Sequence, residues 1–287
     1  MSFISRRSFS LANGKTPLTD EQIRLIAPSA FAAEAHESRS ARYTYIPTSE
    51  VIAGMRDSGF LPVMAKQSRT RDAGKRDFTK HMIRFRYQGA VTGQRRVGET
   101  FPEIVLVNSH DGSSAYQVMA GVFRLVCLNG MVVTEREGEE VRVSHKGDVV
   151  SRVIEGSYEV LEDANTAIAA AEAWTGLRLS RDEQMALADA ARTLRFGDAE
   201  GNVETPIQAE QMLAVRRHDD RGDDLWRTFN RVQEAAIRGG LSAGGRDANN
   251  RRRRVTSREV KGIDQDVKLN KALWLLGERM AQLKGAA

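Results

Sequence analysis

Residues 81–88 read HMIRFRYQ, and this stretch decides the fold class because it alternates with a period of two residues. In an extended strand, His81, Ile83 and Phe85 would lie on one face, and Arg84 and Arg86 on the other. The segment therefore predicts a β-strand, with apolar side chains on one side and guanidinium groups on the other.

Further strands are predicted on both sides of this segment. Apolar runs at 60–66, 103–108 and 141–144 are typical of strands, and residues 43–46 could form a short one. Residues 116–128 are strongly apolar and fit either a helix or a strand. The pair Asn129-Gly130 lies between two apolar triplets, which favours a hairpin turn at that point.

Helix signals dominate the rest of the chain. Capping boxes begin at Thr19 and Ser180, Thr48 is placed to cap a helix over 49–57, and Asp224 to cap one that ends before Gly239-Gly240. Other helices are expected at 158–174, from about 205, and at 264–283. We therefore predict an α+β fold, with an antiparallel sheet in the first half and helices in the second half.

The predicted domain layout follows the same division. Residues 1–40 form an N-terminal arm with a short helix, and residues 41–287 form a single α+β domain, sheet-rich over 41–148 and helical over 149–287. Residues 239–256 are rich in Gly, Ser and Asn and end in arginines, so a flexible basic loop is expected there.

The charge is unevenly distributed along the 287 residues. The net charge is +5, yet residues 39–96 carry +9 and residues 238–287 carry +7, which leaves −11 for the remainder. No apolar run reaches the ~18 residues of a membrane span, and no apolar stretch follows Arg6 and Arg7 as in a secretory signal. The single Cys127 fits a reducing compartment, so we expect a cytoplasmic protein without membrane contact.

Each basic segment is a candidate contact surface for nucleic-acid phosphates. The alternative is a solvated charged surface with no ligand, which is the common outcome for charge runs. The predicted contacts in the first segment are Arg69, Arg71, Lys75, Arg76, Lys80, Arg84 and Arg86. The predicted contacts in the second segment are Arg251, Arg252, Arg253, Arg254, Arg258 and Lys261.

Signals for catalysis are weak. Ser109-His110-Asp111 cannot act as a triad, because successive side chains diverge, and the residues around it favour a turn. The five histidines show no metal-ligand spacing and no nucleotide-binding motif is present, so neither a metal site nor a cofactor is predicted. A metal-dependent nuclease or hydrolase site assembled from His81, His110 and Asp111 stays open as an alternative.

Two stretches resemble a known family. Residues 108–116, NSHDGSSAY, continue into GVFRLVCLNG at 121–130, and LWRTFNRVQE at 225–234 leads through Arg238-Gly-Gly-Leu241 to REVKG at 258–262 and LNKALW at 269–274. Together they resemble domain-of-unknown-function family 932. The resemblance covers roughly residues 40–285 and implies an origin in prophages, plasmids and other mobile elements, without catalytic residues.

The predicted function is therefore DNA binding in a mobile element, without catalysis. Single-strand binding or annealing is one form that this role could take, and the sequence leaves open whether the ligand is single- or double-stranded and whether it is DNA or RNA. The protein could also form homo-oligomers. One alternative is an anti-defence or regulatory protein that acts through protein–protein contacts. The apolar positions around Trp226 and Trp274 are predicted to be core, with Asn230 and Asn270 as buried, hydrogen-bonded side chains.

Overall fold

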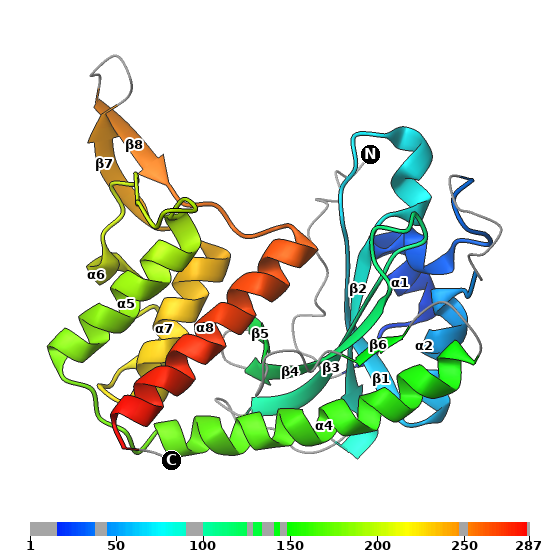
Figure 1. Cartoon of the computed structure of the whole chain (residues 1–287), viewed down its shortest axis with the longest axis horizontal. Helices are drawn as coiled ribbons and strands as arrows, with labels where there is room; N and C mark the ends of the chain where they lie inside the picture. Colours follow the sequence, from blue (N-terminus) through cyan, green and yellow to red (C-terminus); the bar gives the residue numbers. More distant parts are fainter. Residues whose placement is uncertain are drawn as a thin grey trace. The chain divides into compact units, whose positions relative to one another are not determined.

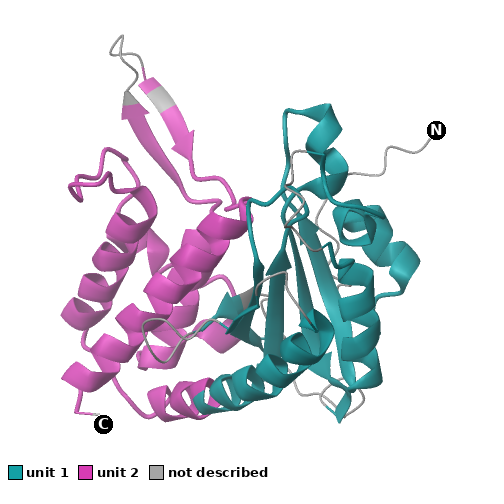
Figure 2. Ribbon diagram, turned by 45° about the vertical axis from the view of Figure 1, so that its right-hand side comes forward, with its two compact units in different colours: residues 1–166 teal, residues 167–287 magenta. Residues whose placement is uncertain are grey.

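A computed structural model of the chain describes residues 16–37, 45–89, 100–124, 129–133, 141–143, 148–246 and 252–285. The chain divides into two compact units, residues 1–166 and 167–287. Figures 1 and 2 show the first unit built on a sheet and the second built mainly from helices. The predicted α+β class is therefore confirmed, with the antiparallel sheet in the first half and helices in the second.

The sheet of the first unit is antiparallel throughout. Its order is β1-β2-β3-β4-β5, and β6 also pairs with β4. The strands are β1 (Phe60–Gln67), β2 (His81–Tyr87), β3 (Thr100–Asn108), β4 (Tyr116–Arg124), β5 (Asn129–Val132) and β6 (Val141–Val143). β2 lies between β1 and β3, so both of its edges are hydrogen-bonded.

Helices cover one face of this sheet (Figure 1). They are α1 (Asp20–Ile26), η1 (Pro28–Phe31), α2 (Thr48–Asp57) and the first part of α4 (Val149–Trp174), while η2 (Ala73–Phe78) lies in the β1–β2 connection. α2 and α4 approach closely at Gly54, where an added Cβ would lie 2.7 Å from Cγ1 of Val150. The glycine is therefore needed for this helix contact.

The second unit packs its helices around aromatic side chains. Its elements are α5 (Arg181–Phe196), α6 (Ala209–Met212), η3 (His218–Asp220), α7 (Leu225–Arg238), β7 (Ser242–Arg246), β8 (Arg252–Thr256) and α8 (Ile263–Leu283). Trp174 stacks on Trp274 with ring centroids 4.7 Å apart, and Phe229 meets both rings edge-on. Gly277 makes room for them, because a Cβ there would lie 2.6 Å from Trp174.

Most predicted elements occur where expected. Both capping boxes, at Thr19 and Ser180, are formed, and Asp224 caps α7, which ends at Gly239. The ambiguous stretch from residue 116 is the strand β4 up to Arg124. The core positions are confirmed as well, since Trp226 and Trp274 are buried.

Four local predictions differ from the structure. The Asn129-Gly130 pair is part of β5, where Asn129 pairs with Arg124, so this pair does not form the predicted turn. Tyr45 and Ile46 are not in a strand. The short helix α6 begins at Ala209, after the predicted start near 205. Residues 239–256, expected to be a flexible loop, contain the paired strands β7 and β8.

Candidate nucleic-acid interface

The strands β7 and β8 form a two-stranded antiparallel ribbon, which we call the arginine ribbon (residues 242–246 and 252–256). It extends beyond the helices of the second unit (Figure 1). Its register pairs Ser242 with Thr256, Gly244 with Arg254, and Arg246 with Arg252. Because directly paired residues of an antiparallel ladder share a face, these three pairs form one face of the ribbon.

The base of the ribbon is fixed by two glycines that follow α7. Gly239 and Gly240 have φ angles of +65° and +79°, in the left-handed region that favours glycine. A Cβ on Gly239 would lie 2.8 Å from the backbone of Arg258, so the two chain segments cross here at a distance that only glycine permits. The amide of Gly240 donates to the carbonyl of Ser257 at 2.9 Å, which anchors the start of the ladder.

One face of the ribbon packs against its own unit. A Cβ on Gly245 would lie 3.2 Å from Cγ of Pro206 and 3.6 Å from Cγ2 of Val255. The side chain of Gln211 donates to the carbonyl of Ser242 at 2.8 Å. Pro206 thus lies against the inner face at Gly245, while Gln211 holds the main chain of β7, so the face opposite Pro206 is the one available to a ligand.

The outer face carries the exposed arginines. Arg252 and Arg254 are both exposed, and no described residue forms an ion pair with either guanidinium group. Beside them, Gly244 is so open that an added Cβ would meet no atom within 4 Å. Ser242 and Thr256 complete the face, with their hydroxyl oxygens 2.8 Å apart. The face therefore combines two cations that have no partner among the described residues, two hydroxyl groups and an open stretch of backbone.

The other predicted contacts of the second segment lie around this ribbon. Arg258 and Lys261 are exposed just after β8, and the carbonyl of Arg258 accepts a hydrogen bond from Arg195 at 2.9 Å. Arg251 lies outside the described residues. Arg253 is described only as part of the β8 backbone, opposite Gly245.

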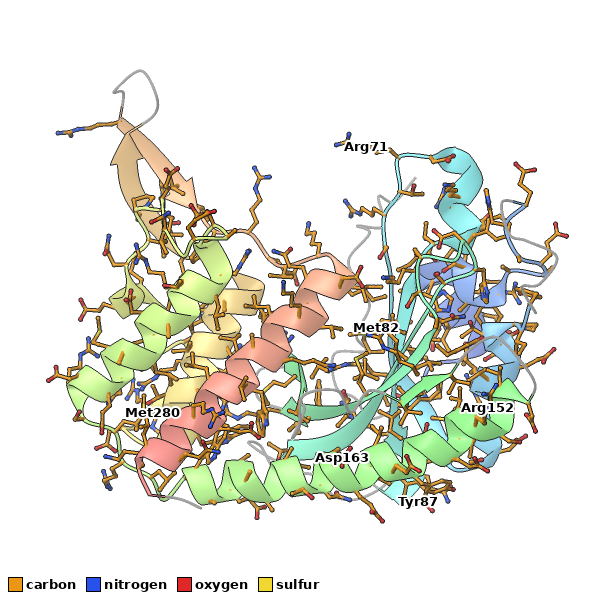
Figure 3. The ribbon with its side chains drawn as sticks, in the orientation of Figure 1. Arg71, Met82, Tyr87, Arg152, Asp163 and Met280 are labelled. Carbon is orange, nitrogen blue, oxygen red and sulfur yellow. The ribbon has the colours of Figure 1, made fainter. Side chains whose placement is uncertain are left out.

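The first basic segment is in the first unit, in the connection between β1 and β2. Arg69, Arg71 and Arg76 are exposed there, whereas Lys75 and Lys80 are half-buried. Figure 3 labels Arg71 at one end of this connection. The segment thus presents three exposed arginines, on a loop that includes η2.

Arg84 and Arg86, in contrast, are not on an open face. Their exposed fractions are 3% and 2%, and both reach the buried carboxylate of Glu103 on β3, at 3.1 and 2.7 Å. Arg86 also lies over the ring of Phe123, 4.0 Å from its centroid, and Arg84 donates to the carbonyl of Met131 at 2.8 Å. The sequence suggested either that this strand face contacts phosphates or that it is a solvated surface. Both interpretations assumed that the guanidinium groups are exposed to solvent. The neighbouring strands bury them because they supply a counter-charge and aromatic rings.

On the opposite face of the same sheet, the structure brings two of the candidate catalytic residues together. The rings of His81 and His110 are 5.5 Å apart and both side chains are fully buried. The hydroxyl of Thr48 lies 2.9 Å from Nε2 of His81 and 3.2 Å from Nε2 of His110, and the amide of Asn108 and the hydroxyl of Tyr116 reach the same oxygen. We call these five residues the Thr48 cluster.

The Thr48 cluster explains why Thr48 does not act as predicted. Its side chain was expected to cap α2, but it makes no capping hydrogen bond and is shared among the cluster instead. Burial lowers the pKa of His81 to about 3, with a further contribution from the neighbouring His110. His81 is therefore neutral at physiological pH, and the cluster is a hydrogen-bonded network of buried side chains.

Asp111 does not complete a catalytic site with these histidines. Its carboxylate accepts a hydrogen bond from the amide of Ser113 at 2.9 Å, and Ser109 bonds to the amide of Ser114, so residues 109–115 form the predicted turn. Throughout the described ranges, no three His, Cys, Asp or Glu side chains gather in a way that could hold a metal ion. The geometry gives the nuclease alternative no support.

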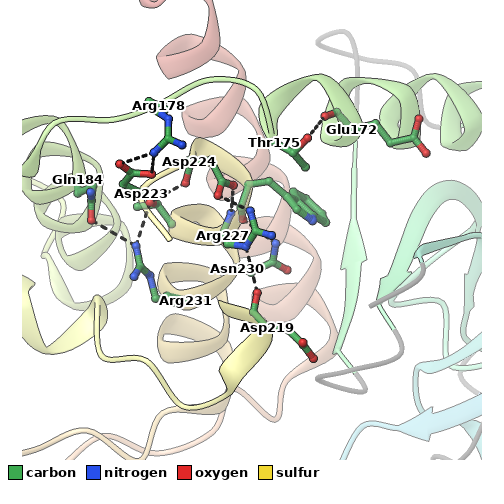
Figure 4. Close-up of polar contacts among 12 residues, drawn as sticks. Glu172, Thr175, Arg178, Gln184, Asp219, Asp223, Asp224, Arg227, Asn230 and Arg231 are labelled. Atoms are coloured by element: carbon green, nitrogen blue, oxygen red, sulfur yellow. Dashed lines mark hydrogen bonds and ion pairs between the residues drawn. The ribbon is translucent and has the colours of Figure 1, made fainter. Parts of the chain in front are cut away.

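A second polar network stabilises α7, the helix that carries the ribbon. Asp224 accepts from the amide of Arg227 at 2.9 Å and pairs with its guanidinium at 2.6 Å, and Arg231 donates to Gln184 of α5 (Figure 4). Asn230 donates to the carbonyl of Trp226 at 2.7 Å, as expected of a buried, satisfied side chain. Asn270 is also satisfied, since its amide oxygen accepts from Gln233 and its amide nitrogen donates to Asp266, both at 2.7 Å. Helix α7 therefore has side-chain hydrogen bonds at its start and along its length.

None of the helices in the described ranges combines the length and the apolar character that a bilayer crossing requires. Together with the fold and the two polar networks, this describes an α+β protein that carries an exposed basic β-ribbon.

Comparison with known proteins assigns the family. The model of a family described as "Domain of unknown function (DUF932)" matches residues 35–274, and the chain belongs to this family. It is 48% identical over 264 residues to UPF0380 protein YafZ of Escherichia coli (strain K12), a match that covers 92% of each chain. UPF0380 protein YfjQ of the same strain matches to the same extent. No solved structure matches the chain.

Proposed function

We propose that the protein binds DNA through the arginine ribbon. The observation that carries this proposal is the outer face of the ribbon, where Arg252 and Arg254 are exposed and have no partner among the described residues. An exposed cation that no carboxylate neutralises is free to displace counterions from a phosphate backbone. Guanidinium groups also bind phosphate in a bidentate manner, which favours Arg over Lys in this role.

The surroundings of these arginines support the same conclusion. Arg258 and Lys261 add exposed positive charge directly after β8, in a C-terminal segment with a net charge of +7. Arg69, Arg71 and Arg76 offer a separate exposed basic surface in the first unit. We leave Arg84 and Arg86 out of the proposed contacts, because Glu103 already neutralises part of their charge in a buried site.

The proposed role is binding without catalysis, in the cytoplasm. The implied origin in prophages and plasmids makes the DNA of a mobile element the expected ligand. Binding to phosphates alone is independent of base sequence, so this role requires no particular recognition sequence.

Fluorescence anisotropy with labelled oligonucleotides tests the proposal. The wild-type protein should bind at about 50 mM salt and lose affinity steeply towards about 200 mM. The double variant Arg252→Gln/Arg254→Gln should bind more weakly at each salt concentration. A protein that does not bind at low salt, or whose binding is indifferent to salt, contradicts the proposal.

A matched control separates a local contact from the effect of total charge. Arg221 and Lys268 are exposed in the same unit and belong to neither strand of the ribbon. The variant Arg221→Gln/Lys268→Gln removes the same two charges, and it should bind DNA nearly as the wild type does. Equal losses in the two double variants would mean that the ribbon has no special role.

A further inference from the structure

The composition of the ribbon indicates which form of DNA it fits. Proteins that bind single strands combine positive charge with aromatic rings on which the bases stack, and each stacked base contributes about 1–3 kcal/mol. Residues 239–262, which include the whole ribbon and its base, contain no Phe, Tyr or Trp. The ribbon therefore has arginines for the phosphates but no platform for unstacked bases.

The shape of the ribbon indicates a duplex groove. The major groove of B-DNA is about 12 Å wide and admits a two-stranded β-ribbon. Two paired strands are about 4.8 Å apart, so a ribbon that enters with the side chains of one face fits that width. Hydroxyl and guanidinium groups, as on Ser242, Thr256, Arg252 and Arg254, can bond to base edges in that groove as well as to phosphates.

Gly244 is the feature of the outer face that the fold does not explain. It lies in the middle of β7, opposite Arg254, and its backbone does not have a positive φ angle. A Cβ there would meet nothing within 4 Å, so no neighbour requires a glycine. Glycine inside a strand weakens it and often marks a place where a ligand approaches the backbone closely. The glycines at 239 and 245, by contrast, have close neighbours that account for them.

We propose that the arginine ribbon enters the major groove of double-stranded DNA with its outer face towards the base pairs. In this arrangement Gly244 is a contact position, where the DNA approaches the main chain of β7 beside Arg254. This inference rests on the proposed DNA binding, and it specifies the form of DNA, the face and one further contact residue.

The test compares Gly244→Val with Ala243→Val. Both variants add methyl groups to neighbouring positions of β7, but Ala243 pairs with Val255 on the inner face. Valine is favoured in strands, so Gly244→Val should leave thermal unfolding unchanged or slightly raise its midpoint. Its affinity for duplex DNA should fall on the order of tenfold, as for the loss of one good groove contact. Ala243→Val should bind duplex DNA as the wild type does.

Two further comparisons complete the experiment. The wild type should bind a duplex more tightly than either of its single strands at the same salt concentration. Netropsin, which fills the minor groove, should leave duplex binding unchanged.

The outcomes separate this inference from the proposal on which it rests. If the wild type binds no DNA of either form, the proposed function fails. If it binds DNA in a salt-dependent way but prefers single strands, is displaced by netropsin, or binds equally well after Gly244→Val, the proposed function stands and this inference is overturned.

Discussion

Two strands of this protein carry arginines two residues apart, and the structure uses them in opposite ways. On β2, Arg84 and Arg86 are buried and share the carboxylate of Glu103. On β8, Arg252 and Arg254 are exposed and have no partner among the described residues. The same local pattern thus gives an internal ion-pair cluster in one unit and an open basic face in the other.

The difference comes from the neighbouring strands. β2 is paired on both edges, and β3 supplies Glu103 while β4 supplies the ring of Phe123. Among the described strands, β8 pairs with β7 alone, and the residue of β7 opposite Arg254 is Gly244. A glycine has no side chain that could pair with the guanidinium group of Arg254 or shield it from water, so this group stays exposed to solvent. Whether an arginine on a strand is buried or exposed therefore depends on the residues of the neighbouring strands.

The largest expected effect is on stability, from Glu103→Gln. The substitution leaves two buried guanidinium groups without their carboxylate, and breaking a buried ion pair typically costs about 3–5 kcal/mol. Urea unfolding followed by circular dichroism measures the loss. The exposed Glu162 gives a matched control, since Glu162→Gln should change the free energy of unfolding by less than about 0.5 kcal/mol. Equal effects would mean that the Arg84–Glu103–Arg86 cluster is not a structural element.

The next largest effect is expected from Thr48→Val, on the other face of the same sheet. Valine has nearly the shape of threonine but lacks the hydroxyl to which His81, His110, Asn108 and Tyr116 are bonded. Leaving buried polar groups unsatisfied costs about 1–3 kcal/mol. The control Thr166→Val changes an exposed hydroxyl on α4, and it should have little effect on the same unfolding curve. A stable Thr48→Val protein would show that the Thr48 cluster is dispensable for folding.

An effect of similar size should appear in the pH dependence of stability. The pKa of His81 is about 3 in the folded protein, mainly because of burial, against 6.5 as the ordinary value. Between these pH values the unfolded chain binds a proton that the folded protein does not, so stability falls as the pH decreases from 6.5 towards 3. The slope from this group is about 1.4 kcal/mol per pH unit.

The variant His81→Gln tests this contribution. Its free energy of unfolding between pH 4 and 6 should decline less steeply than that of the wild type, whereas His218→Gln, at an exposed position, should keep the wild-type slope. Identical slopes in the wild type and His81→Gln would contradict the burial of a neutral His81.

The smallest effect on stability is expected at the ribbon. Arg252→Gln/Arg254→Gln removes exposed charges that have no partner in the described structure, and such surface changes usually stay within about 0.5 kcal/mol. The variant should therefore unfold as the wild type does while binding DNA more weakly. A loss above about 1 kcal/mol would show that these arginines stabilise the fold, as Arg84 and Arg86 do.

Much of the fold was predictable because its signals are local. The capping boxes at Thr19 and Ser180 and the alternation in β2 each specify their own element, and all three occur as predicted. Local signals also placed Asn230 and Asn270 correctly among buried residues with hydrogen-bond partners.

The candidate site was less predictable because it depends on contacts between distant residues. Alternation assigned Arg84 to a face of the sheet, but only pairing with β3 shows that Glu103 covers that face. The residues 239–256 have a composition poor in strand formers, so the ribbon was missed; its strands are held by each other and by contacts such as that of Gln211. The hydrogen bonds of Thr48 could not be predicted, because they form only where three strands and a helix come together.

The salt dependence of duplex binding tests the central claim most directly, when it is measured on three proteins. The slope of log K against log salt should become shallower by about 1.8 in Arg252→Gln/Arg254→Gln, because two phosphate contacts of about 0.9 each are lost. The triple variant Arg84→Met/Glu103→Leu/Arg86→Met replaces the buried cluster with apolar side chains, which proteins often tolerate, and it should keep the wild-type slope. An unchanged slope in the ribbon variant, or a shallower one in a folded triple variant, would contradict the assignment of DNA binding to the exposed arginines.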